Sequence, residues 1–183
     1  MKKIFTYLTM ATMALTMTFA LTSCDDSDAQ EARTLDGSWT GYVDTYFQDR
    51  YGFSGNTYRT TMYFQQTSRY GGVGYEVDYD TRSPYSDYYY CEFDWEVYNG
   101  EISIQYADSW DPVYIYDYRL YSDYFEGYMD DGSYRDIHFR LTYDGNFNWN
   151  PYRSYYAPTR STGETPHYHA SGKFAEIKKE ASE

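Results

Sequence analysis

Residues 93–106 read FDWEVYNGEISIQY, and this stretch decides the fold class of the chain. Apolar and polar residues alternate on both sides of Asn99-Gly100, a pair typical of the tight turn of a β-hairpin, because both turn positions need a positive φ. A turn there predicts three apolar cross-strand pairs: Val97 with Ile102, Trp95 with Ile104, and Phe93 with Tyr106. A slip of one residue would bury the acidic side chains of the first strand, so the pattern favours a single register.

The same alternation continues in short runs over residues 35–153, separated by turn signals, and is typical of an all-β domain. It predicts strands over residues 37–47, 57–66, 72–80, 88–98, 101–107, 113–120, 123–129 and 133–143. A ninth short piece, 147–149, is expected to cover an open end. About eight antiparallel strands in sequence favour a small up-and-down barrel, with a two-sheet β-sandwich as the alternative.

A second hairpin is expected around Asp130-Asp131-Gly132. A two-residue turn at the last two of these residues would place Glu126 opposite Ile137, which mixes a polar and an apolar face. A three-residue loop instead places Phe125 opposite Ile137, with glycine at the left-handed position of a bulge. The three-residue loop is therefore the preferred prediction.

Composition supports a folded acidic domain. The chain has 183 residues and a formal net charge of −13, and aromatic residues make up 22% of it, including 27 tyrosines. The low mean hydropathy of −0.82 understates the material for a core, because a tyrosine ring buries a large apolar area while its hydroxyl finds a partner. The acid excess argues against nucleic acid as a partner, since phosphate binding depends on Lys and Arg.

The N-terminus has the features of an export signal. Lys2 and Lys3 are followed by an uncharged stretch, 4–21, which five threonines make a poor permanent membrane span. Leu21-Thr22-Ser23-Cys24 resembles a bacterial lipobox, in which the cysteine receives lipid. The prediction is a signal peptide over residues 1–23 and lipid attachment at Cys24, which makes the membrane a partner. A general secretory signal with a chance cysteine is the alternative.

An acidic tether is expected over residues 24–34, before the barrel domain. Asp25-Asp26-Ser27-Asp28 resembles the acidic export signal of Bacteroidetes lipoproteins, which implies the outer membrane and exposure at the cell surface. An ordinary acidic linker, with the protein on the periplasmic face, is the alternative. Lipidation of Cys24 would leave Cys91 without an intrachain partner, and its strand position predicts a buried, unreactive thiol.

A resemblance to a known family rests on residues 35–41, Leu-Asp-Gly-Ser-Trp-Thr-Gly. This stretch resembles the Gly-x-Trp opening of lipocalin-like barrels, and most of all the small lipocalin-like lipoproteins of Bacteroidetes, most of which have no assigned activity. The resemblance implies that Trp39 has a structural role, packing at one barrel end. Lipocalins stack an arginine on that tryptophan, and Arg140 is the nearest counterpart here.

Three acidic residues and three histidines are the candidate catalytic or metal-binding groups. Glu92, Asp94 and Glu96 share one strand face at a spacing of about 6.5–7 Å, within the range of an inverting glycoside hydrolase. Such pairs need one carboxyl in an apolar pocket, whereas alternating acids are the ordinary outer face of an antiparallel strand. His167 and His169 offer only two possible metal ligands, and they lie in a tail. His138 is expected to face solvent. The sequence therefore predicts no enzyme, no metal and no cofactor.

Aromatic residues outside the expected core are the remaining functional candidates. Their alternation points outward or places them in loops, which predicts a ligand-binding surface of Tyr88, Tyr90, Trp110, Tyr114 and Tyr116. Exposed aromatics stack on sugars or anchor protein interfaces, although cross-strand pairing alone also explains many strand tyrosines.

Two functions follow from these candidates. The first is a non-catalytic surface lipoprotein that binds a glycan or another amphipathic ligand. The alternative is a structural or accessory lipoprotein with protein partners and no small-molecule ligand. A ligand-sized cavity would favour the first, and an interior filled by large side chains would favour the second: Phe64, Phe93, Trp95, Ile104 and Phe139. Residues 154–183 are expected to form a flexible tail.

Overall fold

The computed structural model describes residues 27–49, 52–82, 88–133, 136–153, 168–169 and 173–174. A helix over residues 27–35 precedes the first strand. The remaining elements are β1 (Gly37–Asp49), β2 (Gly52–Ser54), β3 (Thr57–Gln66), β4 (Gly71–Asp80), β5 (Tyr88–Tyr98), β6 (Glu101–Tyr106), β7 (Val113–Leu120), β8 (Tyr124–Asp130), β9 (Asp136–Tyr143), α2 (Asn150–Arg153) and β10 (Tyr168–His169).

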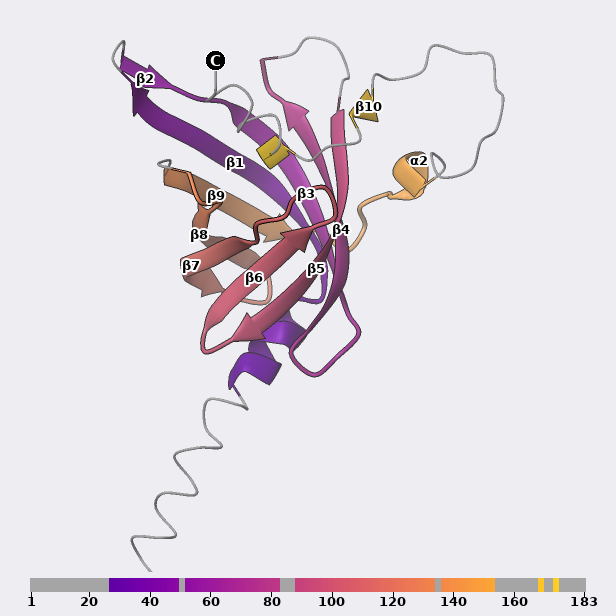
Figure 1. Ribbon diagram of the computed structural model, residues 1–183. Coiled ribbons are helices and arrows are strands. Elements are labelled where there is room, and N and C mark those ends of the chain that lie inside the picture. Colours follow the sequence, from indigo (N-terminus) through magenta and orange to yellow (C-terminus); the bar gives the residue numbers. More distant parts are fainter. Residues whose placement is uncertain are drawn as a thin grey trace, which may run out of the picture.

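Eight antiparallel strands close into an up-and-down barrel (Figure 1). Each strand from β3 to β9 pairs with the next one in sequence, and β1 closes the ring by pairing with both β3 and β9. β2 pairs only with the far end of β1, and β10 adds a short parallel pairing to β5. The predicted barrel is confirmed, and the sandwich alternative is excluded because no sheet edge separates two layers.

The β5–β6 hairpin has the predicted register. Val97 lies opposite Ile102, and the two other predicted apolar pairs are also formed. Asn99 and Gly100 have φ values of 53° and 72°, as a tight turn of this kind requires. All six paired residues are buried in the barrel interior. Turn chemistry and alternation both specify this register, which is why the sequence sufficed.

The β8–β9 hairpin differs from its prediction. Phe125 lies opposite Leu141, and Met129 takes the place opposite Ile137. The faces are as expected, because all of these side chains point into the barrel, and Gly132 has the positive φ that was predicted. The loop is longer than three residues, and the pairing is shifted accordingly. A shift by an even number of residues preserves the alternation, so the apolar pattern alone did not specify the register.

The helix over residues 27–35 replaces most of the expected acidic tether. Ala29, Ala32 and Leu35 are buried, and the last two belong to the main barrel core. Asp28 is buried as well, and its carboxylate accepts hydrogen bonds from the backbone N–H groups at the Asn99-Gly100 turn. The helix therefore closes the barrel end that carries the β5–β6 turn, seen at the bottom of Figure 1.

A second aromatic cluster lies on the outside of the barrel wall. Trp149 packs against Tyr63 and Tyr75 on the outer face of β3 and β4, and its indole N–H donates to the hydroxyl of Ser38 at 2.9 Å. Tyr152 closes the cluster with a hydroxyl contact of 2.6 Å to Tyr79. The expectation that residues 147–149 cover an open end is wrong: they cover the side wall.

Trp39 has the structural role that the resemblance implied. Its side chain is fully buried, its indole N–H donates to the carbonyl of Leu35 at 2.7 Å, and its ring meets Phe125 edge-on. The expected partner is wrong, however, because Arg140 lies on the outer face and pairs with Glu126 at 2.7 Å. The indole is held instead by the helix and by neighbouring rings.

The tail is not wholly free of the barrel. Tyr168 and His169 pair with the start of β5, and Lys173 and Phe174 are buried, the second within the main core. His167 lies outside the described residues, as do the signal peptide and Cys24. Most of the range 154–183 is likewise outside them, so the flexible-tail prediction is corrected only at these four positions.

Candidate functional site

The connection between β6 and β7 presents one tryptophan to solvent. Its turn is fixed by hydrogen bonds: the N–H of Ser109 donates to Tyr106 O at 3.1 Å, and its hydroxyl donates to Asp111 O at 2.9 Å. The side-chain amide of Gln105 donates to Ser109 O at 2.6 Å. Trp110 is 99% exposed. The loop therefore exposes a large apolar ring to water on a backbone that hydrogen bonds hold in place.

Two adjoining hollows lie on the outer wall beside this loop. One, of about 620 Å³, runs over β4, β5 and β6 as far as Ser109, and the other, of about 480 Å³, reaches Pro112 and Tyr114. Both include the cross-strand row formed by Val73, Asp94 and Gln105. Together they form an open groove across the wall, and Trp110 lies in the loop between two of its lining residues, Ser109 and Pro112.

The groove combines apolar and hydrogen-bonding surface. Val73 is 42% exposed, and Tyr114 supplies an exposed ring. Asp94 and Gln105 supply a carboxylate and an amide, and Ser103 supplies a hydroxyl. Among the described residues that line either hollow, none is Arg or Lys. Such a surface suits a neutral ligand with many hydroxyl groups better than an anion.

The predicted acidic face of β5 is confirmed. Glu92, Asp94 and Glu96 are all exposed on the outer wall, while the residues between them are buried inside. General acid catalysis by a carboxyl pair needs one member in an apolar pocket, and none of these three occupies one. Their arrangement fits a solvated outer face.

The five aromatic candidates fall into two groups. Trp110, Tyr114 and Tyr116 are exposed, and the ring of Tyr116 stacks on Tyr128 with centroids 6.0 Å apart. Tyr88 and Tyr90 also point outward from the barrel. They are buried beneath the segment that contains Trp149 and Tyr152. Tyr114 lines the groove, whereas Tyr90 contacts two of its lining residues, Tyr75 and Glu92, from beneath the cover.

A charged cluster that sequence reasoning missed surrounds Glu126 on the outer face of β8. Arg119 and Arg140 donate to its carboxylate at 3.0 and 2.7 Å, and Tyr124 donates to it as well. His138 lies on the same face, as predicted, with Nε2 at 3.3 Å from Glu126 Oε1. The hydrogen bond from Tyr124, followed by that from Arg140, lowers the pKa of Glu126 to about 2. The corrected β8–β9 register brings Glu126 opposite Arg140, which explains why the cluster was not foreseen.

The thiol of Cys91 is buried, as predicted. Its S–H donates to Asp108 Oδ1 at 3.1 Å. Burial, assisted by the hydrogen bond to Asp108, raises the pKa of Cys91 to about 12. A nucleophilic cysteine needs its thiolate form near neutral pH, so this protonated thiol is a poor nucleophile.

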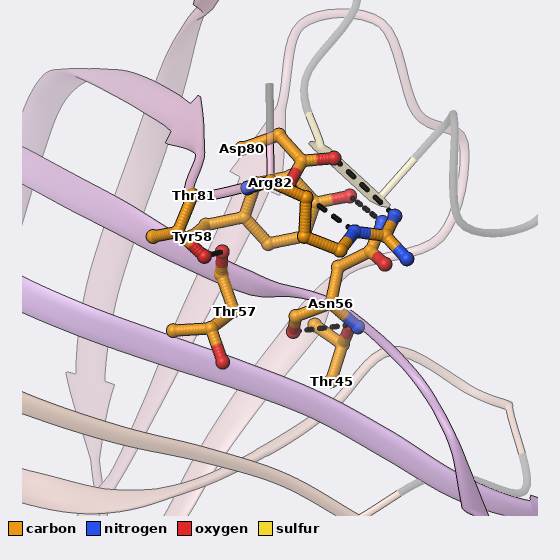
Figure 2. A network of polar contacts seen from close by, with 7 residues as sticks. All are labelled: Thr45, Asn56, Thr57, Tyr58, Asp80, Thr81 and Arg82. Carbon is orange, nitrogen blue, oxygen red and sulfur yellow. Dashed lines mark hydrogen bonds and ion pairs between the residues drawn. The ribbon is translucent and has the colours of Figure 1, made fainter. Parts of the chain in front are cut away.

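Polar contacts hold the barrel rim at the end away from the helix (Figure 2). The hydroxyl of Thr45 donates to Asn56 O at 3.1 Å and accepts from Asn56 N at 3.3 Å, which ties β1 to the start of β3. The hydroxyl of Thr81 donates to Thr57 O at 2.8 Å and ties β4 to β3. The amide of Asn56 donates to the Tyr58 hydroxyl at 3.2 Å. Neighbouring strand ends are therefore fixed to one another at this rim.

A polar cluster that the sequence analysis missed lies just inside that rim. Glu76 and Asp78 are both 1% exposed on the inner face of β4. The Tyr106 hydroxyl donates to Glu76 Oε2 at 2.6 Å, and the Thr60 hydroxyl donates to Asp78 Oδ1 at 2.5 Å. The ammonium of Lys173 contacts both carboxylates. The structure therefore reveals both the burial of these acids and the cation that contacts them.

Comparisons with known proteins gave no match to a family, to a curated protein or to a solved structure. Among the described residues, no group of three or more His, Cys, Asp or Glu side chains is arranged to hold a metal ion. Within the same part of the chain, the helices are too short or too polar to cross a membrane.

Proposed function

We propose that the protein is a non-catalytic binding module that takes a neutral glycan in the outer-wall groove beside Trp110. One observation carries the proposal: the Trp110 ring is 99% exposed in a hydrogen-bonded loop at the border of an open groove with polar walls. An isolated loop tryptophan without a partner leaves a large apolar area in water. A ligand that covers the ring removes this cost.

The chemistry of the groove supports a sugar as the ligand. A sugar ring has an apolar face that stacks on an aromatic ring and hydroxyl groups that need donors and acceptors. Tyr114 offers a ring in the wall of the groove, and Trp110 offers another in the loop between two lining residues, Ser109 and Pro112. Asp94 and Gln105 offer an acceptor and an amide. The groove is open at its surface and runs across several strands, which suits an extended chain.

The barrel interior supports an outer site rather than a central one. All five large side chains that were expected to fill it are buried in one continuous core: Phe64, Phe93, Trp95, Ile104 and Phe139. The same filled interior favours the second candidate, an accessory lipoprotein whose exposed aromatics contact a protein partner and no glycan. The two candidates use the same surface and differ in what covers it.

A lipid anchor would place this site facing away from the membrane. Lipidation of Cys24, expected from its lipobox, leaves two residues before the helix that starts by residue 27, a reach of at most about 11 Å. The helix closes the barrel end with the β5–β6 turn, and Trp110 lies in a loop at the other end of β6. The proposed location is the outer membrane, at the cell surface, as in the lipocalin-like lipoproteins that the sequence resembles.

A glycan-binding screen with Trp110→Ala tests the proposal. Neutral polysaccharides and oligosaccharides are offered to purified wild-type protein, and hits are measured by calorimetry. Loss of the anchor ring is expected to weaken binding by about 2 kcal/mol or more. Tyr98→Ala is the matched control, since Tyr98 is exposed near the opposite barrel end and its removal should leave affinity unchanged.

Two outcomes contradict the glycan proposal. The first is a wild-type protein that binds no glycan in the screen, which leaves the accessory role as the better account. The second is a glycan that binds Trp110→Ala as tightly as wild type, which would place the site elsewhere on the barrel.

A further inference from the structure

Two carboxylates inside the barrel are neutralised by the chain's own C-terminal segment. Glu76 and Asp78 alternate along the inner face of β4, and their cross-strand neighbours on β3 are Met62 and Thr60. Neither carboxylate reaches solvent. Each accepts one hydrogen bond from a neutral hydroxyl of the barrel wall: Glu76 from Tyr106, and Asp78 from Thr60.

The only cation that contacts this pair among the described residues is Lys173. Its side chain is 0% exposed, and its ammonium donates to Glu76 Oε1 and lies 3.4 Å from Asp78 Oδ1. Its neighbour Phe174 packs on the ring of Tyr106, with centroids 5.3 Å apart. The barrel wall therefore supplies two acceptors and an aromatic surface, and the tail supplies an ammonium and a ring.

We propose that this part of the barrel interior is a binding site for a primary ammonium group with an adjacent aromatic ring, and that Lys173 and Phe174 occupy it as an internal ligand. The acceptors belong to β4, whose position the barrel fixes on both sides. The ammonium belongs to a segment that joins the barrel after residue 153, beyond all of its wall strands. The proposal goes beyond the outer groove and does not depend on it.

Burial disfavours the charged form of each group in this site, so an ionised carboxylate here needs a cation beside it. Burial raises the pKa of Asp78 to about 8 and lowers the pKa of Lys173 well below its usual range. Each charge is costly inside the barrel by itself, and removing one partner of a buried pair leaves the other uncompensated. Without Lys173 and Phe174, the site would hold two buried carboxyl groups and no cation. A free ammonium of matching shape would then restore the lost contacts.

The aromatic neighbour narrows the class of ligand. The Lys173 ammonium lies 4.6 Å from the centre of the Phe174 ring, and this ring faces Tyr106. A small inorganic cation would satisfy the carboxylates but leave the space of the ring unfilled. An arylalkyl primary amine supplies both parts in one molecule, and phenethylammonium is the simplest probe of this class.

Removal of both internal-ligand side chains tests the site directly. Purified wild-type protein and the double variant Lys173→Ala/Phe174→Ala are titrated with phenethylammonium chloride by calorimetry, with 2-phenylethanol as the neutral control of the same shape. We expect the double variant to bind the amine at least about tenfold more tightly than wild type, about 1.4 kcal/mol, because the internal ammonium and the internal ring are both gone. The alcohol should bind neither protein measurably. Adding Glu76→Gln to the double variant should abolish amine binding.

Thermal melting keeps the test decisive if the double variant Lys173→Ala/Phe174→Ala folds poorly. The amine should raise the melting temperature of this variant, and 2-phenylethanol at the same concentration should not, because binding to the folded state stabilises it. A folded variant that binds no amine would overturn the proposal. So would a variant that the amine fails to stabilise, or amine binding that persists when Glu76→Gln is added.

Discussion

The carboxylate of Asp28 accepts a hydrogen bond of 2.8 Å from the backbone N–H of Asn99, 71 residues away in the sequence. Its second oxygen accepts from the N–H of Gly100 at 3.1 Å. One side chain of the helix before β1 thus holds the turn that sets the register of the β5–β6 hairpin. The helix is thereby part of the barrel rather than a linker to it.

Replacing this carboxylate should destabilise the whole domain. Asp28→Ala leaves two turn N–H groups without their acceptor, and charged hydrogen bonds of this kind contribute about 1.5–3 kcal/mol. Denaturant unfolding measures the loss. The control is Asp94→Ala, an exposed position on the barrel wall that should change stability by less than about 0.5 kcal/mol. Equal midpoints for the two variants would mean that the helix does not close the barrel.

The tryptophans should divide sharply into structural and surface residues. Trp95 is buried against Phe64, with ring centroids 5.5 Å apart, and donates to Val73 O at 3.1 Å. Trp95→Ala is expected to cost about 3–5 kcal/mol, whereas Trp110→Ala should stay within about 0.5 kcal/mol. Chemical denaturation of both variants checks this. A large loss for Trp110→Ala would show that its ring packs on the barrel.

The Glu126 cluster should make stability sensitive to acid. The pKa of Glu126 is about 2 in the folded protein and 4.5 as its ordinary value. A lowered pKa gives stability that is fully present above about pH 4.5 and is lost as the pH falls towards 2. Glu126→Gln should flatten this part of the curve of unfolding free energy against pH. An unchanged acid limb would show that Tyr124, Arg119, His138 and Arg140 do not act on this carboxylate in solution.

The proposed anchor makes a simple prediction about fractionation. Cys24→Ala removes the lipid attachment site, and insertion of acyl chains is what would hold the protein to the membrane. The variant is expected in the soluble fraction and the wild type in the membrane fraction after a high-salt wash, followed by immunoblotting. A variant that still sediments with membranes would contradict the lipoprotein assignment.

The sequence was sufficient where two local signals agreed and insufficient where only one was present. At Asn99-Gly100 the turn residues and the alternation specify the same register, and the structure has it. At Gly132 the alternation specified faces but allowed an even shift, and the pairing of Phe125 was wrong. Turn chemistry is weaker in a longer loop, so it could not correct the error.

Tertiary contacts explain what the sequence could not show. The helix over residues 27–35 is short and depends on burial of Ala29, Ala32 and Leu35 for its stability, as the weak helix propensity of short segments requires. Trp149 is an isolated ring in a polar stretch until β3 and β4 supply its partners. Lys173 lies in a charged tail, and nothing in its local sequence indicates burial against Glu76. Alternation correctly predicted that Tyr88 and Tyr90 point outward, but it could not show that the segment with Trp149 covers them.

The central claim, that a ligand covers Trp110, is tested most directly by fluorine NMR of protein labelled with 5-fluorotryptophan. The four resonances are assigned by single tryptophan-to-phenylalanine variants, and neutral glycans are then titrated into the protein. We predict that the Trp110 resonance alone shows full solvent exposure in the free protein and that it alone shifts when the glycan binds. A titration in which a bound glycan moves the buried tryptophans and leaves Trp110 unchanged would contradict the account.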